Sequence, residues 1–464
     1  MNLNSITHIY FIGIGGIGMS ALARYFKTLG KEVAGYDRTA TTLTSQLIAE
    51  GMDIHFEDNV QLIPPAFKNK SNSDKILVIY TPAIPKSHSE LNYFNDNTYS
   101  VVKRSKVLGL IASADFTVAV AGTHGKTTTS SMIAHILHSS GVNIAAFLGG
   151  IAKNFNSNFV LPQKNNKIVN VVEADEFDRS FLTLFPNIAV ISSMSADHLD
   201  IYGTHDELVR SYNTFAGQVK EHLILKNGLK VSNVKADITT YSLQSDADVH
   251  AKDITISNRS YKFNVMVGNH LIKDLVLGLP GRHNIENAVA AIAVAFKLNI
   301  PEEKIREALA TYSGVNRRFD YQIKTESLVF IDDYAHHPEE LSAAISSVKE
   351  LYSDKKITGV FQPHLFTRTR DFANEFAQSL SLLDEVILLD IYPARELPIE
   401  GVTSEIIFKK INCANKIMLS KEKLVEYVEN HIPEVLLTLG AGDIDTCVSP
   451  LRNMLVKKNL STAN

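Results

Sequence analysis

The chain has 464 residues, of which 45% are hydrophobic and 21% charged, a balance typical of a folded globular protein and unlike that of a disordered one. Its 46 basic and 50 acidic side chains leave a formal net charge of −4, which excludes a general attraction to nucleic acid or to an anionic membrane surface. At about 150 residues per domain, the length predicts about three domains.

The sequence favours a cytosolic protein. No uninterrupted apolar run reaches the roughly 18 residues of a membrane-spanning helix, and the N-terminus lacks the pattern of a signal peptide. The two cysteines, Cys413 and Cys447, form no CxxC pattern, so free thiols in a reducing compartment are favoured over a disulfide framework. We therefore expect neither a membrane span nor a nucleic-acid partner.

The N-terminal region alternates strand-like and helix-like segments. Apolar runs typical of buried strands occupy residues 8–14, 32–37 and 76–84. Residues 19–30 have helical spacing with Gly30 as the stop, and the polar residues 67–75 predict a surface loop. The alternation predicts a parallel sheet of βαβ units over residues 1–106.

A glycine loop joins the first strand to the first helix. Gly13, Gly15 and Gly18 form a GxGxxG pattern, which lets a diphosphate approach the N-terminus of a helix. Asp37 ends the next strand, at about the spacing where a dinucleotide fold places its ribose carboxylate. Locally, the pattern fits a dinucleotide, another phosphate-bearing ligand, or glycines that serve only helix–strand packing.

Two further α/β regions follow. Strand-like runs at 116–123, 168–175, 187–194 and 222–226 predict a second sheet, and the alternating residues 248–267 predict a small β insert in it. After a charged turn near residue 316, strand-like runs occupy residues 328–333, 357–363, 385–394 and 435–443. We expect three consecutive α/β domains: a Rossmann-like domain over 1–106, a P-loop-type ATPase domain with the insert over 107–316, and a Rossmann-like domain over 317–464.

The second region opens with its own glycine loop. Gly122, Gly125, Lys126 and Thr127 form GxxGKT between a strand and a helix, which is the P-loop pattern without its first glycine. Backbone N–H groups of such a loop can wrap a triphosphate, with Lys126 on the β- and γ-phosphates and the Thr127 hydroxyl on Mg²⁺. The alternative is a solvated lysine at the start of a helix.

Carboxylates follow the next strand of this region, as a metal site beside ATP requires. Glu173, Asp175, Glu176 and Asp178 lie at its carboxyl end, and His198 follows the strand after that. Carboxylate and imidazole groups both bind hard cations, so Glu173 and His198 are candidate ligands. A structural histidine in a loop is the alternative for His198.

The helix that follows the insert opens with three polar residues. His283, Asn284 and Asn287 could contact a base or cap the helix. Arg317 and Arg318 lie at the domain junction, where a guanidinium could reach a phosphate or form an exposed ion pair.

Two loops of the last region combine histidine with arginine. Asp332, Asp333, Tyr334, His336 and His337 follow one strand, and Pro338 is expected to start a helix. The next strand along the chain is followed by His364, Arg368 and Arg370. We expect these strand ends to be neighbours, so that the two loops form a clamp for a carboxylate and an amine, which the glycine turn at 439–443 could approach.

Nine segments, taken together, carry a resemblance. They are GIGGIGMSALA, GTHGKTTT, EADEFDRSF, DHLDIYG, GRHNIENAVAA, DDYAHHPEE, PHLFTRTRDF, YPARELPIEGVTS and TLGAGDI, in this order over nearly the whole chain. In this set the sequence resembles the Mur ligases of peptidoglycan precursor synthesis, and among them the branch that adds alanine. The resemblance implies an ATP-dependent ligase for cell wall biogenesis, with UDP-N-acetylmuramate, L-alanine, ATP and Mg²⁺ (or Mn²⁺) as partners, as a monomer or homodimer.

The resemblance also implies roles for individual residues. The UDP-sugar would contact Gly15, Gly16, Gly18, Ser20, Asp37, Tyr80 and Ala83. ATP would contact Gly122, Thr123, His124, Gly125, Lys126, Thr127, Thr128, His283, Asn284, Asn287, Arg318 and Asp333. Metal ions would be held by Thr127, Glu173 and His198. The amino-acid pocket would consist of Tyr334, His336, His364 and Arg368. Those implied to act in catalysis are Lys126, His198, His336 and Arg368.

The implied chemistry passes through an acyl phosphate, made from the muramate carboxylate and the γ-phosphate and then attacked by the amine of L-alanine. Either the remaining phosphate or a third-domain histidine could accept the amine's proton. Two departures stand out. The turn YTPAIP lacks the serine of the family pattern, and residues 204–218 contain no lysine that could be carbamylated, which favours the alanine-adding branch.

Three rival functions remain open. A recycling ligase would attach a whole peptide to the same UDP-sugar, and would need an open amino-acid pocket. A nicotinamide-dependent oxidoreductase would bind NAD(H) at Gly13 to Gly18. A non-catalytic regulator would bind ATP through Lys126 without ever releasing ADP.

Overall fold

The structure is a computed structural model, and it describes residues 3–162, 167–195, 199–244, 246–394 and 396–462. The chain forms two compact units. The first consists of Met1–Lys252, Val265–Lys273 and Asn287–Tyr312, and the second of Asp253–Asn264, Asp274–Glu286 and Ser313–Asn464. The predicted domain boundaries at 106 and 316 stay predictions.

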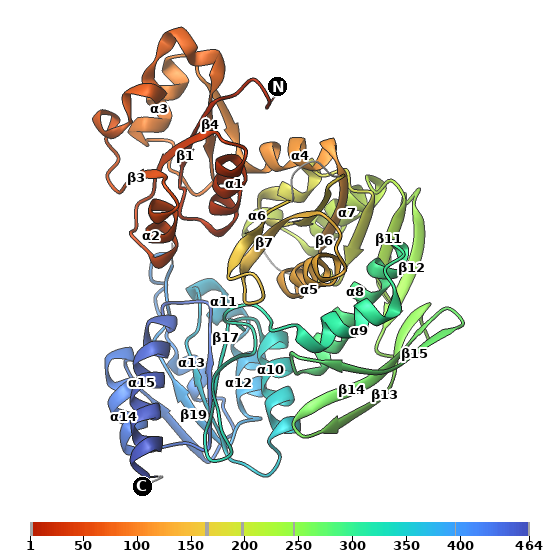
Figure 1. Cartoon of the computed structure of the whole chain (residues 1–464). Helices are drawn as coiled ribbons and strands as arrows, with labels where there is room; N and C mark the ends of the chain where they lie inside the picture. Colours follow the sequence, from red (N-terminus) through yellow and green to blue (C-terminus); the bar gives the residue numbers. More distant parts are fainter. Residues whose placement is uncertain (1–2, 163–166, 196–198, 245, 395, 463–464) are drawn as a thin grey trace. The chain divides into compact units, whose positions relative to one another are not determined.

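The first sheet has five parallel strands in the order β3-β2-β1-β4-β5 (Figure 1). They are β1 (His8–Ile12), β2 (Glu32–Tyr36), β3 (Asp53–His55), β4 (Ile76–Tyr80) and β5 (Ser100–Lys103). The strand order reverses at β1, which places the loop after β1 at the carboxyl edge where ligands bind in such sheets. The predicted parallel sheet of βαβ units is confirmed.

The helices of this region are α1 (Ile17–Thr28), α2 (Thr42–Ala49), α3 (Ser89–Asp96) and α4 (Arg104–Ala114). Gly30 lies just beyond α1 with a φ of +75°, as a helix stop requires. The expected surface loop at 67–75 is wrong in part. It consists largely of two 3-10 turns, η2 (Pro65–Lys68) and η3 (Lys70–Lys75), because Phe67 is buried and draws the first turn onto the sheet; η1 (Val60–Leu62) precedes them.

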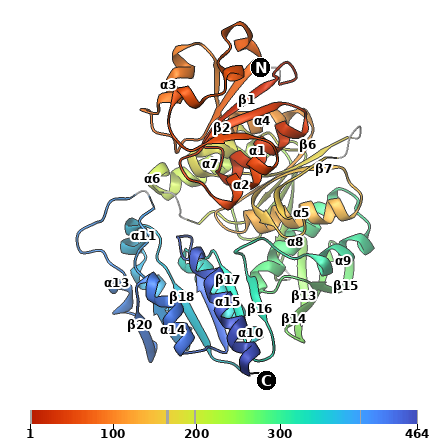
Figure 2. The same ribbon diagram turned by 60° about the vertical axis from the view of Figure 1, so that its left-hand side comes forward.

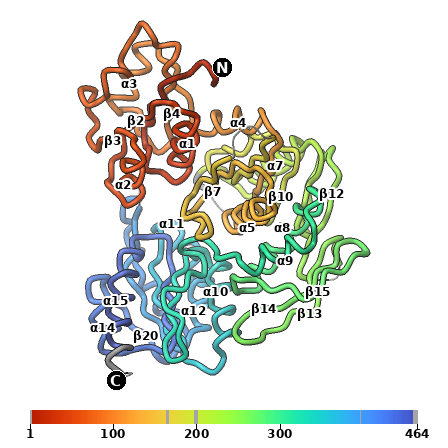
Figure 3. The backbone as a smooth tube through the Cα atoms, viewed as in Figure 1, coloured from red at the N-terminus to blue at the C-terminus, as the bar shows by residue number. Residues whose placement is uncertain are grey.

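The second sheet has ten strands in the order β15-β14-β13-β12-β11-β10-β6-β9-β7-β8. Its parallel part contains β6 (Phe116–Ala121), β7 (Ile144–Ala152), β9 (Val169–Glu173), β10 (Ile188–Ile191), β11 (His222–Lys226) and β12 (Asp237–Ser242). The edge strand β8 (Ser157–Val160) pairs antiparallel with β7. The predicted insert is present as β13 (Val249–Ser257), β14 (Ser260–Val267) and β15 (His270–Leu277), which continue this sheet (Figure 3).

The helices of this region are α5 (Lys126–Ser139), α6 (Leu199–Tyr202), α7 (His205–Gly217), α8 (Arg282–Lys297) and α9 (Glu302–Thr311), with a 3-10 segment η4 (Phe177–Thr183). The first two sheets share one hydrophobic cluster within the first unit. Helix α1 packs against β7 (Figure 2) and also against β8. At this contact Arg24 donates a buried hydrogen bond to Asn158 Oδ1. The first glycine loop is therefore anchored to the second sheet through α1.

The third sheet has the order β16-β17-β21-β18-β19-β20. Its strands are β16 (Asp320–Lys324), β17 (Val329–Asp333), β18 (Ile357–Phe361), β19 (Glu385–Leu388), β20 (Asn415–Met418) and β21 (Val435–Leu439). Only β16 is antiparallel to its neighbour. The sequence analysis made the strand ends that carry the two histidine loops neighbours, which is wrong because β21 lies between β17 and β18.

The helices here are α10 (Pro338–Leu351), α11 (Phe366–Asp371), α12 (Ala373–Leu380), α13 (Glu405–Phe408), α14 (Leu424–Asn430) and α15 (Asp445–Thr462), with a short η5 (Lys421–Lys423). Pro338 is the first residue of α10, as predicted. The three α/β regions agree with the predicted fold class. Among the described residues, no helix has both the length and the apolar character needed to cross a membrane.

Candidate active site

The first glycine loop is held by the end of β2. Gly13, with a φ of +92°, and Ile14 both donate backbone hydrogen bonds to Tyr36 O, at 2.8 and 3.0 Å. The N–H of Gly15 donates to Asp37 Oδ2 at 2.8 Å. Asp37, expected beside a ribose, thus bonds the loop itself. The Gly15 N–H, which the GxGxxG pattern would offer to a diphosphate, is therefore bonded to a side chain of the protein.

Close packing explains why the loop needs glycine. A Cβ on Gly15 would lie 2.8 Å from Thr44 Cγ2 and 2.9 Å from Asp37 Oδ2, and one on Gly18 would lie 2.7 Å from Arg104 Nη1. Arg104 begins α4 and places a guanidinium beside the loop. Arg104 was not predicted from the sequence, although it follows the apolar pair at 101–102, which lies in β5.

The other residues expected at the UDP-sugar occupy different surroundings. Gly16 is exposed at the start of α1, while Tyr80 ends β4 half-buried and Ala83 lies exposed in the following turn. Ser20 is fully buried: its hydroxyl donates to Ile17 O at 3.0 Å and accepts from Asn158 Nδ2 at 2.9 Å. The structure gives the Ser20 hydroxyl a packing role between the first two sheets.

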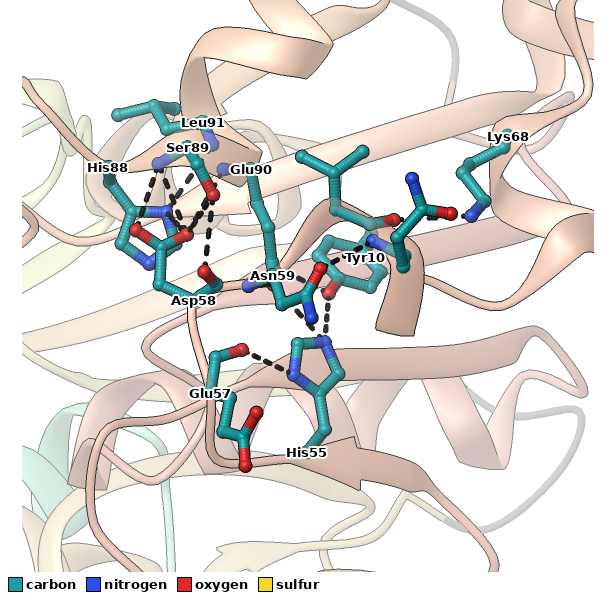
Figure 4. A network of polar contacts seen from close by, with 12 residues as sticks. Tyr10, His55, Glu57, Asp58, Asn59, Lys68, His88, Ser89, Glu90 and Leu91 are labelled. Atoms are coloured by element: carbon teal, nitrogen blue, oxygen red, sulfur yellow. Dashed lines mark hydrogen bonds and ion pairs between the residues drawn. The ribbon is translucent and has the colours of Figure 1, made fainter.

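A buried polar network lies at the carboxyl end of β3 in the same sheet (Figure 4). Tyr10 Oη donates to Glu90 Oε2 at 2.8 Å, Asn59 N donates to Glu90 Oε1 at 3.2 Å, and His55 Nε2 lies 2.8 Å from Tyr10 Oη. Glu90 is fully buried, and burial raises its pKa to about 7. Burial also raises the pKa of Tyr10 and lowers that of His55. The network joins β1, β3 and α3.

The second glycine loop is braced by two serines that follow β10. A Cβ on Gly122, whose φ is +136°, would overlap Ser192 Oγ. Ser192 Oγ donates to His124 O, and Ser193 Oγ accepts from His124 N at 2.7 Å and lies 2.9 Å from Thr123 Oγ1. The sequence analysis treated these serines only as part of a strand. Two hydroxyl residues directly after a strand could have indicated that they contact the glycine loop.

Lys126 is the first residue of α5, and its ammonium is bound by a carbonyl and by a buried carboxylate. Its Nζ donates to Gly122 O at 2.7 Å and lies 2.8 and 2.7 Å from the two carboxylate oxygens of Glu176. Burial works to lower the pKa of Lys126, but the charges of Glu176, Asp175 and Glu173 outweigh it, so the pKa is raised. From the sequence, Glu176 was expected only among the carboxylates near a metal site; in the structure its fully buried carboxylate is the main partner of Lys126.

Oxygen donors suitable for a hard cation stand at this loop. Thr127 is buried in the first turn of α5 with Thr128, and Glu173 ends β9, where it pairs in register with Val120 of β6. The Glu173 carboxylate accepts a hydrogen bond from Gly149 N at 3.1 Å. A hydroxyl and a carboxylate at the mouth of the loop fit Mg²⁺ chemically. His198, the third expected ligand, lies outside the described residues.

The three polar residues at the start of α8 differ in their contacts. Asn287 lies against the second loop, because its Oδ1 is 2.7 Å from where a Cβ of Gly125 would stand. Asn284 is buried and donates to Pro280 O at 2.6 Å, which is a local bond of the helix start. Burial, reinforced by the charge of Arg318, lowers the pKa of His283 to about 4, so its imidazole is neutral at pH 7.

In the second unit, Arg317 and Arg318 take different roles. Arg317 donates to Asp332 at 3.1 Å and to Gly440 O at 2.7 Å, so it ties β17 to the turn after β21. The guanidinium of Arg318 lies 5.1 Å from the centroid of the Tyr334 ring and faces Glu340 at 3.7 Å. The exposed ion pair considered for both is wrong for Arg317, since Asp332 is buried.

Asp333 is a buried brace of the loop that carries Tyr334. It accepts hydrogen bonds from Phe319 N at 2.7 Å and Ala335 N at 2.8 Å. Burial raises the pKa of Asp333 to about 6, against the opposing charge of Arg318.

The histidine loops of the third sheet meet despite the intervening β21. The ring centroids of Tyr334 and His336 are 5.2 Å apart, and those of His336 and His364 are 6.0 Å apart. His364 also stacks on Tyr392 at 5.8 Å, a residue that the sequence analysis missed although it follows a strand in the motif YPARELPIEGVTS. Burial lowers the pKa of His336 to about 4, and Arg368 of α11 adds a positive charge beside it. The four expected pocket residues are thus brought together.

Comparison with known proteins identifies the family of the chain. Three family models match in succession: "Mur ligase family, catalytic domain" at residues 8–116, "Mur ligase middle domain" at 120–295, and "Mur ligase, glutamate ligase domain" at 317–443.

Curated relatives match over nearly the whole chain. The UDP-N-acetylmuramate–L-alanine ligase of Flavobacterium johnsoniae is 51% identical over 457 residues, covering 98% of this chain and 99% of that protein. The enzyme of the same name from Flavobacterium psychrophilum is 52% identical over 460 residues, covering 99% and 100%. The crystal structure of the UDP-N-acetylmuramate–alanine ligase of Thermotoga maritima superposes with a TM-score of 0.80 at 26% identity, covering 98% and 99%. The chain therefore belongs to the Mur ligase family.

Proposed function

We propose that this chain is an ATP-dependent ligase that joins L-alanine to the carboxylate of UDP-N-acetylmuramate in peptidoglycan precursor synthesis. The observation that carries the proposal is identity of 51% and 52%, over almost the full length, to two curated enzymes of that name. We further propose that it works in the cytoplasm, as a monomer or homodimer.

The first glycine loop supplies the site for the UDP diphosphate. It lies between a parallel strand and the N-terminus of α1, and the Arg104 guanidinium beside it adds a positive charge. Gly15, Gly16 and Gly18 form its floor. Asp37, Tyr80 and Ala83 lie at the neighbouring strand ends, where the uridine and sugar would extend.

The second glycine loop supplies the site for ATP. Residues Gly122 to Thr128 wrap the phosphates, Asn287 lies against Gly125, and His283 and Asn284 open the same helix near the adenine. A Mg²⁺ ion held by Thr127 and Glu173 would neutralise charge on the phosphates. We assign His198 as a further ligand from the family pattern. We also assign Arg318 and Asp333 as ATP contacts from the family pattern.

The proposed reaction has two steps. The muramate carboxylate attacks the γ-phosphorus of ATP, so that an acyl phosphate forms and ADP leaves, while Lys126 stabilises the charge on the transferring group. The amine of L-alanine then attacks the acyl carbon, and phosphate leaves with the oxygen that bridged it to carbon. Closure of the site around these groups would keep water from the acyl phosphate.

The residues around Tyr334 suit a small amino acid. Arg368 can bind the alanine carboxylate with two N–H groups, and Tyr334 and His364 form walls next to His336. Since the low pKa of His336 keeps its imidazole neutral, it can accept a hydrogen bond from the amine and orient it. The departing phosphate, or a histidine of this pocket, takes the amine's proton.

Release of ADP and phosphate from the purified chain tests the proposal. The chain is given ATP, Mg²⁺ and UDP-N-acetylmuramate with either L-alanine or an L-alanyl peptide, and the UDP-linked product is identified by mass spectrometry. We expect phosphate release and a product with L-alanine. Release only with the peptide would favour a recycling ligase and overturn the assignment, as would the absence of ADP in every mixture.

A further inference from the structure

The Lys126 ammonium is bound by a backbone carbonyl and by a buried carboxylate. An ammonium carries three N–H donors. Its three acceptors are Gly122 O at 2.7 Å and the two carboxylate oxygens of Glu176 at 2.8 and 2.7 Å. A nucleotide phosphate that approaches Lys126 therefore meets an ammonium already paired with a carboxylate.

Glu176 is fixed in place by its own backbone. Its carbonyl oxygen accepts hydrogen bonds from Tyr202 Oη at 2.6 Å and from Arg179 N at 2.9 Å, and its side chain is 1% exposed. The carboxylate stays beside the loop as a buried negative charge, in the region where the proposed function places the phosphates of ATP.

The two other acidic side chains that follow Glu173 have partners elsewhere. Asp175 faces Arg104 at 3.6 Å, and Asp178 pairs with Lys103 at 3.2 Å near the surface. Among the described residues, Glu176 is the carboxylate in hydrogen-bond contact with Lys126. Glu176 therefore differs from its acidic neighbours in contacting Lys126 directly.

We propose that Glu176 is a positioning residue that holds the Lys126 ammonium and competes for it with the phosphates of ATP. The inference rests on the proposed function in one respect, the role of Lys126 in binding phosphate. The further point is that Glu176 makes the affinity for the nucleotide lower than it would be without this carboxylate. The same exchange returns Lys126 to Glu176 when ADP leaves, which favours product release.

Titration of ATP alone, with Mg²⁺ present, tests the competition by calorimetry on the full chain. Glu176→Gln removes the negative charge and one acceptor oxygen while keeping the shape of the side chain. We expect ATP to bind about tenfold more tightly, equivalent to about 1.4 kcal/mol. Glu176→Asp keeps the charge but withdraws it by one methylene group, and we expect an affinity between those of Glu176→Gln and the original chain.

Asp178→Asn is the matched control, because Asp178 lies in the same segment but its carboxylate pairs with Lys103. Its positive φ of 51° suits asparagine. We expect its ATP affinity to be unchanged. In turnover, Glu176→Gln should lower the KM for ATP by about tenfold without raising kcat, since tighter binding also retains ADP. A residue that only stabilised the fold would not lower this KM.

Two results would overturn the proposal: ATP affinity that is equal or weaker in folded Glu176→Gln, or the same tightening in Asp178→Asn. If Glu176→Gln does not fold, Glu176→Asp decides, because unchanged or weaker ATP binding by that variant contradicts competition. The proposed function fails separately, when the original chain binds ATP but forms no product with UDP-N-acetylmuramate and L-alanine.

Discussion

The two glycine loops join a parallel strand to a helix in the same way, but they obtain their charge differently. The second loop carries its own cation, Lys126, and holds it against the buried carboxylate of Glu176. The first loop contains no basic residue and takes its positive charge from Arg104, at the start of α4. A glycine pattern thus specifies a space for phosphate, while the residues packed around it decide which phosphate-bearing ligand binds.

Lys126→Ala should have the largest effect on activity, and it should alter only the ligand of the second loop. Loss of a cation that stabilises the transferring phosphoryl group is expected to lower kcat/KM for ATP by about 100- to 1000-fold. Binding of UDP-N-acetylmuramate, measured by calorimetry without ATP, should stay within about twofold of the original chain. A comparable loss of UDP-sugar binding would contradict the separation of the two sites.

The free energy of unfolding should depend on pH through Glu90, and Glu90→Gln should remove that dependence. The folded pKa of Glu90, about 7, lies above its ordinary value of 4.5. The stability that it contributes is therefore complete below pH 4.5 and is lost as pH rises through 7. Relative to Glu90→Gln, the original chain should lose up to about 3 kcal/mol over this range, measured by urea unfolding at several pH values.

Glu57→Gln is the control for that comparison, because the Glu57 side chain is exposed in the loop after β3, close in sequence to His55 of the same network. We expect its unfolding free energy to follow that of the original chain at every pH. A constant difference between the original chain and Glu90→Gln would refute the assigned cause.

Gly15→Val should weaken binding at the first loop alone. Its Cβ would lie 2.8 Å from Thr44 Cγ2 and 2.9 Å from Asp37 Oδ2, so the loop must shift. We expect UDP-N-acetylmuramate to bind about 30-fold more weakly, with ATP affinity near normal. Gly16→Ala should lose far less, because the nearest atom would be 3.5 Å from its Cβ. Weakened ATP binding with intact UDP-sugar binding would reverse the assignment of the loops.

Arg104→Ala should have the smallest effect and tests the source of the first loop's charge. Loss of one charged hydrogen-bond donor is expected to weaken UDP-N-acetylmuramate binding by about tenfold. Lys106→Ala removes an exposed charge from the same helix and should leave that affinity unchanged. Equal losses in both variants would indicate a general effect of charge, with no specific role for Arg104.

The sequence predicted those parts of the fold that depend on local pattern. Alternating apolar runs located the main parallel strands, and Pro338 and Gly30 marked the ends of helices because each restricts or frees the backbone by itself. Strand order could not be predicted in this way. The insertion of β21 between β17 and β18 depends on pairing between strands more than seventy residues apart.

The same distinction between local pattern and distant pairing applies to the residues of the candidate site. Lys126 and Thr127 could be predicted because the chemistry and the spacing lie within one short motif. Arg104, Ser192 and Glu176 could not, because their roles arise when separate strand ends meet at one edge of a sheet. Ser20 illustrates the reverse: its position in the motif suggested a ligand contact, and packing against Asn158 uses the hydroxyl instead.

The fate of one oxygen atom tests the proposed ligase most directly. UDP-N-acetylmuramate labelled with ¹⁸O in its carboxylate is incubated with the chain, ATP, Mg²⁺ and L-alanine, and the released phosphate is analysed by mass spectrometry. Because the bridging oxygen of an acyl phosphate leaves with phosphorus, the account predicts one ¹⁸O atom in the phosphate formed with each amide bond. Unlabelled phosphate, released at the same rate as product, would contradict it.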